Sequence, residues 1–418
     1  MNEQKNKSIW ILNHHATTAG HRHYELACEF AKRGYQTIVF ASSFSHETHQ
    51  YRYHEACHIE TIAPGVIYVY LHTTPAYMGN GVKRVLNMFS YLYLAKRYAP
   101  QIWLKYGKPD YVIGSCVHPL AWEAASWIAR RCKAKFICEV RDFWPLSLIE
   151  LSGMSKYHPL VLFFSIIERR AYRRAEKIVT TFPYGYQYIC GERGFPKEKV
   201  FWMPNGIHIE DSNQQSPLPA ELEAFLDNHW CCLYAGSFVK SECIDFMLEA
   251  FEQLQDQEIY FAIVGSGHEQ ANLEKFILEH SLTHVKLFPR MSKPQVMTAL
   301  RKAQCCLAAI ENRPIYHYGL SMNKLNDYLL SGTPVIFACD APNAVQETEN
   351  LSIPYGDPHQ LAEAILKVKN MDEQTRKRIG ESGQRLIKTT YDYSIIAQSY
   401  IHMLEAGACN EVGGKGVK

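Results

Sequence analysis

Three polar residues in the second half of the chain, Ser321, Lys324 and Asp327, have the spacing of one short helix. Ser321 is an N-cap residue type, and the run that it opens stops at Gly332, just before Pro334. A helix start has unpaired backbone N–H groups, which form an anion site together with a lysine in the first turn. Asp327, one turn later, could accept hydrogen bonds from sugar hydroxyls, so the segment predicts a site for a nucleoside diphosphate. An (i, i+3) ion pair between Lys324 and Asp327 is the structural alternative.

Two glycine-bearing turns follow apolar runs and could bring the backbone close to a ligand. In the first, Gly236 permits this approach and Lys240 could reach a phosphate. An ordinary strand-to-helix turn with a solvated lysine is the alternative. In the second, Gly265 and Gly267 resemble the start of a dinucleotide fingerprint, but Gln270 stands in place of its third glycine. A nicotinamide dinucleotide is therefore not expected.

Four histidines, His14, His15, His21 and His23, lie close together near the N-terminus. Imidazoles can bind metals, but no carboxylate or cysteine accompanies these residues at ligand spacing. A polar loop that lines a binding site is the favoured interpretation. His118 follows another apolar run, and it could line the same site or be a satisfied core histidine.

The composition is that of a globular protein with two domains. With 418 residues, 47% of them hydrophobic, the chain can form two cores of ordinary size. A net charge of +2 gives no indication of a nucleic-acid partner. Thirteen cysteines cannot all pair, so reduced, buried thiols in a cytoplasmic protein are expected. The first residues do not resemble a signal peptide, and no apolar run approaches the roughly 18 residues of a membrane-spanning helix.

Apolar runs of strand length alternate with longer helical patterns in both halves of the chain. Strands are expected at residues 9–12, 37–41, 66–71, 111–114, 136–140 and 178–181, and then at 231–235, 260–264, 285–288 and 306–310. This alternation predicts parallel sheets covered by helices. Domains are expected at 1–205 and 230–390, with a linker at 206–229 and a final helix at about 391–408 that packs back on the first domain. In such folds ligands bind at the carboxyl ends of strands, so the cleft between the domains is the expected site.

Five segments, in this order, resemble the family-4 glycosyltransferases. They are Ala19-Gly-His-Arg-His-Tyr-Glu-Leu-Ala27, Glu139-Val-Arg-Asp-Phe-Trp-Pro145, Met203-Pro-Asn-Gly-Ile207, Tyr234-Ala-Gly to Lys240, and Ser321-Met-Asn-Lys-Leu-Asn-Asp-Tyr328 with Gly332-Thr-Pro-Val-Ile336. The resemblance covers nearly the whole chain and implies the GT-B fold, an α/β architecture of two Rossmann-like domains facing across a cleft. The Arg-Asp-Phe-Trp-Pro run is most similar to the branch that builds bacterial surface polysaccharides, such as O-antigen, capsule or exopolysaccharide.

The resemblance also implies a donor site in the second domain. The family's phosphate lysine corresponds to Lys240, and its base-binding strand end corresponds to Leu287 and Phe288. The arginine that often accompanies this lysine is missing, and Ser237 stands in its region. The implied nucleotide-binding residues are Gly20, Gly236, Ser237, Gly265, Leu287, Phe288, Leu320, Ser321, Met322, Asn323 and Asp327.

One of two glutamates typical of the family is missing from this chain. The second, which binds the ribose, corresponds to the shorter carboxylate Asp327, whereas Gly319 stands in place of the first. Backbone N–H groups at 320–322 could take over its role, or Glu311 could do so from a distance.

In the first domain the family's glycine-rich acceptor-side loop corresponds to residues 19–20, close to donor phosphate and acceptor. His21 and His118 are the expected acceptor-side residues. Asp142 is expected to contact sugar or acceptor, unless it merely caps the following helix, and Arg141 stands where many relatives have a histidine.

The activity implied by the resemblance is retaining sugar transfer from a nucleotide-sugar, with a UDP-sugar as the expected donor and a saccharide or lipid-linked saccharide as acceptor. The catalytic residues implied are Lys240, Lys324, Asp142 and Arg141. The lysines and the helix start would stabilise the leaving diphosphate. Because the chain has no Asp-x-Asp signature, neither a metal ion nor another cofactor is expected. A nucleotide-sugar 2-epimerase and a non-catalytic sugar-nucleotide-binding partner subunit are the alternatives.

Two further segments, 81–97 and 160–174, combine apolar and aromatic residues with lysines and arginines. Such helices suit the surface of an anionic bilayer, and a peripheral position on the inner face of the cytoplasmic membrane is a hypothesis. Helices that face the core, with the charged ends of long side chains reaching solvent, are the alternative.

Overall fold

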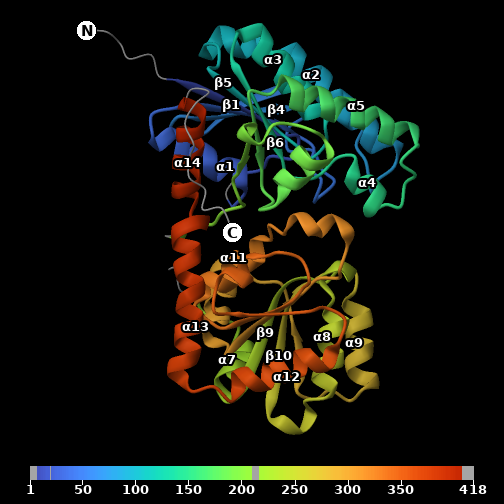
Figure 1. The fold of residues 1–418 in the computed structure, drawn as a ribbon, viewed down its shortest axis with the longest axis vertical. Helices are drawn as coiled ribbons and strands as arrows, with labels where there is room; N and C mark the ends of the chain where they lie inside the picture. Colours follow the sequence, from blue (N-terminus) through green and yellow to red (C-terminus); the bar gives the residue numbers. More distant parts are fainter. Residues whose placement is uncertain (1–6, 19, 210–215, 407–418) are drawn as a thin grey trace. The chain divides into compact units, whose positions relative to one another are not determined.

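The computed structural model describes residues 7–18, 20–209 and 216–406, and the chain divides into two compact units (Figure 1). Unit 1 comprises residues 1–204 and 393–418, and unit 2 comprises residues 205–392. Each unit has a sheet of mostly parallel strands covered by helices. The expected α/β fold class is therefore confirmed.

Unit 1 contains an eight-stranded sheet in the order β3-β4-β2-β1-β5-β6-β7-β8. The strands are β1 (Ser8–Leu12), β2 (Gln36–Ser42), β3 (Cys57–Ala63), β4 (Val66–Leu71), β5 (Tyr111–Ser115), β6 (Lys135–Val140), β7 (Lys177–Thr180) and β8 (Val200–Trp202). Neighbours pair in parallel except β3 and β4, which are antiparallel. The two edge strands, β3 and β8, were not predicted. β3 is half-exposed and partly polar, and β8 has only three residues, so neither has the apolar run of a buried strand.

Helices cover both faces of this sheet, which is why residues of β1, β2 and β4 are almost all buried. They are α1 (Arg22–Lys32), α2 (Val82–Tyr106), α3 (Leu120–Cys132), α4 (Leu146–Glu150), α5 (Pro159–Arg174) and α14 (Tyr393–Glu405), with the short helices η1 (Gln187–Glu192) and η2 (Lys197–Lys199). The final helix α14 packs against α1, where the rings of Tyr400 and Phe30 lie 5.7 Å apart.

Unit 2 contains a six-stranded parallel sheet in the order β11-β10-β9-β12-β13-β14. Its strands are β9 (Trp230–Ser237), β10 (Ile259–Ser266), β11 (Val285–Phe288), β12 (Cys305–Ala309), β13 (Val335–Ala338) and β14 (Leu351–Ile353). Its helices are α7 (Ala220–Asn228), α8 (Ile244–Glu252), α9 (Gln270–Glu279), α10 (Lys293–Lys302), α11 (Asn323–Ser331), α12 (Pro358–Lys369) and α13 (Glu373–Leu386). The short helices within its described residues are η3 (Lys240–Glu242), η4 (Gln255–Gln257), η5 (Pro314–Tyr318), η6 (Ala344–Glu347) and η7 (Ile387–Tyr391).

The segment expected as a linker, 206–229, differs from that expectation because its described ends belong to unit 2. The backbone N–H of Ile207 donates to the Tyr391 carbonyl at 2.8 Å. Residues 220–228 form α7, whose Glu223 is bound by Lys302 at 2.8 Å. The polar composition of the segment concealed these contacts, since both partners are distant in sequence.

Candidate functional site

The expected donor-side residues of unit 2 that precede α11 in the sequence, from Gly236 to Phe288, lie at the carboxyl ends of three neighbouring strands. β11, β10 and β9 are adjacent in the sheet, and Gly265 pairs in register with Gly236. Phe288 is the last residue of β11, and Lys240 opens η3 directly after β9. The ends of parallel strands meet at one edge of a sheet, so the fold brings these residues together. The Lys240 side chain is exposed and forms no ion pair or hydrogen bond with a described residue.

Two glycines let the backbone at this edge come close to its neighbours. A Cβ atom on Gly236 would lie 2.5 Å from the Tyr234 hydroxyl oxygen and 2.9 Å from the Lys324 Nζ. A Cβ atom on Gly265 would lie 1.9 Å from the Gly236 carbonyl oxygen. Gly265 is therefore required by the packing of the strands. At Gly236, the lack of a side chain lets the Lys324 ammonium lie close to the backbone.

Lys324 lies in the first turn of α11, but its ion-pair partner is Glu242 of η3 rather than Asp327. Its Nζ is also 3.2 Å from the Tyr234 hydroxyl and 4.8 Å from the centre of that ring. Burial lowers the pKa of Lys324, and the Glu242 carboxylate opposes this shift. The alternative, an (i, i+3) ion pair between Lys324 and Asp327, therefore does not form.

Asp327 points to a different partner. Its carboxylate lies 3.3 Å from the Nζ of Lys293, the first residue of α10. Burial raises the pKa of Asp327, and Lys293 opposes this shift. Its side chain is 21% exposed, so the carboxylate can still be reached by a hydroxyl.

The start of α11 differs from the prediction in its capping. The helix begins at Asn323 with Met322 as N-cap residue, and no side chain caps it. The Ser321 hydroxyl instead accepts a hydrogen bond at 3.1 Å from the backbone N–H of Asn205. The Asn205 side chain also donates to the Ser321 carbonyl at 3.0 Å. Asn205, from the Met-Pro-Asn-Gly segment, thus holds the chain just before the helix.

The backbone conformation at position 319 does not suit the first of the two glutamates that the family resemblance leads us to expect. Gly319 has φ 89°, in the left-handed region where a glutamate would be strained. The N–H of Leu320 is not available to replace that carboxylate, because it donates to the Pro342 carbonyl at 3.0 Å. Glu311, the other candidate to take over the role of that carboxylate, already forms an ion pair with Arg313 at 2.6 Å. The N–H groups of Ser321, Met322 and Asn323 stay candidates for binding an anion.

The expected base-binding strand end is the edge strand β11. Leu287 is half-buried, whereas Phe288 is buried and packs against Phe225 with ring centres 5.5 Å apart. Backbone groups after this strand, rather than the Phe288 ring, are therefore accessible to a base.

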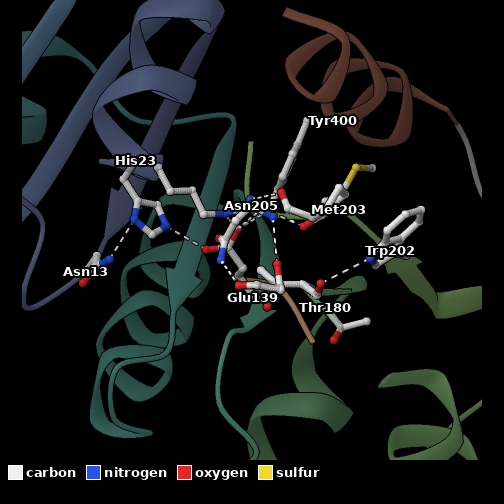
Figure 2. A network of polar contacts seen from close by, with 12 residues as sticks. Asn13, His23, Glu139, Thr180, Trp202, Met203, Asn205 and Tyr400 are labelled. Carbon is white, nitrogen blue, oxygen red and sulfur yellow. Dashed lines mark hydrogen bonds and ion pairs between the residues drawn. The ribbon is translucent and has the colours of Figure 1, made fainter. Parts of the chain in front are cut away.

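In unit 1 a buried polar network at the end of β6 organises the expected acceptor-side segments (Figure 2). The Glu139 carboxylate accepts hydrogen bonds from Arg22 at 2.9 and 3.1 Å and from the Tyr400 hydroxyl at 2.7 Å. Its other oxygen is 2.7 Å from His23 Nε2, and Asn13 lies 2.7 Å from His23 Nδ1. Burial alone would raise the pKa of Glu139, but Arg22 and His23 hold it well below its usual range.

The network holds together two of the segments that were expected on the acceptor side, the start of α1 and the end of β6. Arg22 and His23 belong to the first turn of α1, directly after Gly20 and His21, while Asp142 follows β6 three residues after Glu139. Glu139 is the first residue of the Glu-Val-Arg-Asp-Phe-Trp-Pro motif and was not predicted to be a site residue. Its signal was a carboxylate inside an apolar strand, which needs a buried partner.

The exposed candidates in unit 1 are His21 and Asp142. His21 is the N-cap residue of α1, but its side chain makes no capping bond. Asp142 does not cap α4, because that helix begins at Leu146 with Pro145 as its N-cap residue. Arg141 is half-buried beside it.

The glycine-rich loop is described only in part. Gly20 has φ 87° and its N–H donates to the Glu25 carboxylate at 2.6 Å. Ala19 lies outside the described residues.

His118 lies in the interior rather than at an exposed edge. It is fully buried, and its Nε2 is 2.6 Å from the Nδ1 of His14. Its Nδ1 is also buried and has no hydrogen-bond partner among the described residues. Burial lowers the pKa of both imidazoles well below its usual range. Its burial favours the alternative of a core histidine over an exposed acceptor-side residue.

Each unit of the chain matches a glycosyltransferase family model, and the two models differ. Residues 19–211 match the description "Glycosyltransferase Family 4", and residues 231–370 match "Glycosyl transferases group 1". A candidate colanic acid biosynthesis glycosyl transferase of Escherichia coli K12, WcaI, is 24% identical over 265 residues, which are 62% of this chain and 64% of that relative. The match thus spans less than two thirds of the relative's length.

Solved structures share the fold across nearly the whole chain. Sucrose-phosphate synthase from Thermosynechococcus elongatus has a TM-score of 0.71 at 17% identity and covers 95% of this chain and 98% of its own. The Anabaena protein HepE, in complex with UDP and glucose, has a TM-score of 0.65 at 14% identity and covers 95% and 99%. These similarities confirm the expected GT-B fold class, an α/β fold with two Rossmann-like domains.

Proposed function

Because the chain belongs to the family-4 glycosyltransferases with the GT-B fold, we propose that it is a retaining, metal-independent glycosyltransferase of cell-surface polysaccharide biosynthesis. The proposed donor is a UDP-sugar, and the proposed acceptor is a saccharide or a lipid-linked saccharide. HepE was solved with UDP and glucose, and the name of WcaI refers to colanic acid, a surface polysaccharide; both support the proposal.

The observation that supports the proposal is the grouping of cations and backbone N–H groups at the start of α11. Lys324 places its ammonium against the Gly236 backbone, and the N–H groups of Ser321 to Asn323 precede it. Lys240 adds a second, unpaired cation from η3 of the same unit. A diphosphate needs this combination of helix start and cations. Asp327, one turn further on, would bind the ribose hydroxyls.

In the proposed reaction the bond between the sugar C1 and the diphosphate oxygen breaks, and a bond from C1 to the acceptor oxygen forms on the same face. The acceptor proton passes to the leaving phosphate, so UDP is released and no separate base is required. Lys240 and Lys324 stabilise the charge that builds on the diphosphate, which lowers the barrier because both groups are in place before the reaction. Asp142 and Arg141 would orient the sugar and the acceptor.

The test is incubation of the full chain with single UDP-sugars, with and without saccharide acceptors, in buffer containing EDTA. UDP release is measured, and NMR gives the configuration of the new glycosidic bond. We expect acceptor-dependent release and retention at C1. An inverted product, or activity that requires added Mg²⁺, would contradict the proposal.

Two other outcomes would favour the alternatives. Conversion of UDP-N-acetylglucosamine without acceptor would identify a 2-epimerase. Tight binding of UDP without any turnover would identify a non-catalytic partner subunit, an alternative that the absent carboxylate at Gly319 favours.

We also propose that unit 1 binds the surface of an anionic membrane through α2 and α5. Within the described residues no helix is long and apolar enough to cross a bilayer. Large apolar side chains are nevertheless exposed on neighbouring faces of the two helices, which touch through Phe89 and Phe163 with ring centres 5.9 Å apart. They are Val82, Leu86, Phe89 and Tyr93 on α2, and Leu162, Phe163 and Ile166 on α5.

Cations accompany this apolar surface. Lys83, Arg169 and Arg173 are exposed on the same helices, whereas the acidic Glu168 is buried and paired with Arg193 at 2.8 Å. Each cation near an anionic surface contributes about 1 kcal/mol. The alternative for these helices was that their apolar residues face the core. Inner side chains such as Phe164 are indeed buried, so each helix has one apolar face toward the core and a second one that is exposed.

Flotation with phosphatidylglycerol vesicles at low salt tests this surface. We expect binding that weakens with salt and is lost in Ile166→Asp. The matched control is Leu278→Asp, which changes an exposed leucine of unit 2 that is 79% exposed. Absence of binding by the unchanged chain at low salt would refute the surface, as would equal losses in both variants.

A further inference from the structure

The ion pair between Glu242 and Lys324 suggests a role for a residue that no motif of the chain singles out. The two side chains are only 18% and 15% exposed, and they come from η3 and α11, which are 82 positions apart in sequence. We propose that Glu242 is a positioning residue of the donor site, whose carboxylate holds the Lys324 ammonium beside the Gly236 backbone, ready to bind the donor diphosphate. This inference rests on the proposed function.

Hydrogen bonds of two tyrosines hold the backbone around the ammonium. The Tyr234 hydroxyl, 3.2 Å from Lys324 Nζ, donates to the Ser237 carbonyl at 2.9 Å. The Tyr328 hydroxyl binds the backbone of Ala235 twice, accepting from its N–H at 2.8 Å and donating to its carbonyl at 3.0 Å. Two tyrosines therefore fix the end of β9, whereas the lysine side chain has a flexible stem and needs an anchor of its own.

The number of N–H donors on the Lys324 ammonium supports a positioning role for Glu242. A lysine ammonium has three N–H donors. In the described structure one can donate to the Glu242 carboxylate and one to the Tyr234 hydroxyl, which leaves a third for an incoming phosphate oxygen. A lysine held in this way can bind a phosphate without releasing either partner.

Glu242 also affects the charge of the lysine. Burial disfavours the charged ammonium and lowers its pKa, while the adjacent carboxylate raises it. Without Glu242 the ammonium would lose its proton more readily and would adopt more rotamers. Both effects weaken binding of an anion, and the first grows as the pH rises.

The opposite role is also physically possible, and the sign of one measurement separates the two. If Glu242 only competed with phosphate for Lys324, removing its charge would tighten nucleotide binding. If Glu242 positions Lys324, removing its charge weakens binding.

The experiment measures UDP and pyrophosphate binding by calorimetry in the unchanged full-length chain, Glu242→Gln, Glu242→Asp and the control Glu249→Gln, an exposed carboxylate on α8. In Glu242→Gln we expect roughly tenfold weaker binding near neutral pH, the size of one lost charge-assisted contact. The loss should increase toward pH values of about 9, and Glu242→Asp should restore part of the affinity. Glu249→Gln should bind as the unchanged chain does.

Unchanged or tighter binding in Glu242→Gln would overturn the inference. So would a loss that is independent of pH and accompanied by a lower melting temperature, because that pattern indicates a purely structural role. The titration of Lys324, followed by NMR with ¹³C-labelled lysine, gives a second readout. A fall in its pKa in Glu242→Gln is expected even if the chain binds no nucleotide, so failure of the proposed function and failure of the pairing are distinguishable.

Discussion

Replacing Glu139 by glutamine tests the buried network of unit 1 most directly. The side chain is fully buried, and its two carboxylate oxygens accept from Arg22, His23 and Tyr400 (Figure 2). Glutamine keeps the shape, but it has one acceptor oxygen and adds an NH₂ group that faces donors. The Arg22 guanidinium would stay buried without its counter-charge.

The expected magnitude follows from that uncompensated charge. Breaking a buried ion pair by removing one partner costs about 3–5 kcal/mol. For a domain the size of unit 1, each kcal/mol lowers the melting temperature by about 2–4 °C, so the transition of unit 1 should fall by about 6–20 °C. Hydrogen bonds from Arg22 to the Met203 carbonyl at 3.1 Å stay intact and favour the lower part of this range.

The assay is unfolding by heat and by urea followed by tryptophan fluorescence, which give the melting temperature and the free energy of unfolding. Six of the seven tryptophans belong to unit 1, because Trp230 is the one in the range of unit 2, so the signal reports mainly on unit 1. Glu47→Gln, which changes an exposed carboxylate of the same unit, is the matched control and should be nearly neutral. A loss of less than about 1 kcal/mol in Glu139→Gln would refute the reasoning, since it would mean that Arg22 is solvated or finds another anion.

Three further predictions concern pH, packing and catalysis. Burial lowers the pKa of His14 and His118, so on acidification the unfolded chain binds protons before the folded chain does. The free energy of unfolding should therefore fall below about pH 6.5, by about 1.4 kcal/mol per histidine and pH unit. Asparagine at both positions should flatten the pH dependence of the urea midpoint. Gly265→Ala should destabilise unit 2 by about 1–3 kcal/mol, because its Cβ would meet the Gly236 carbonyl oxygen at 1.9 Å. Urea unfolding followed by far-UV circular dichroism measures this loss, since six of the seven tryptophans lie in unit 1. Lys240→Ala should leave the melting temperature unchanged but slow sugar transfer by about 10²–10³-fold; unchanged turnover would dismiss its role.

The alternation of strands and helices could be predicted because it depends on local patterns. The buried strands of both sheets, such as β1 and β10, have apolar runs that are visible without knowledge of their neighbours. Edge strands such as β3 escaped prediction, because a half-exposed strand has no continuous apolar run. The Ser321 cap was wrong for a related reason: its hydroxyl is bound by Asn205, a residue 116 positions away, and a local rule cannot include that contact.

The sequence by itself determined that a lysine and a carboxylate lie on one short helix next to a strand of a parallel sheet, and it predicts that the start of this helix binds an anion. Only the tertiary structure decided which groups pair. Lys324 binds Glu242, 82 positions away, and Glu139 binds Arg22, 117 positions away. The physical reason is that helix and strand patterns repeat over a few residues and are visible locally. The partner of a buried charge depends instead on the strand order, because the strand order brings distant segments into contact.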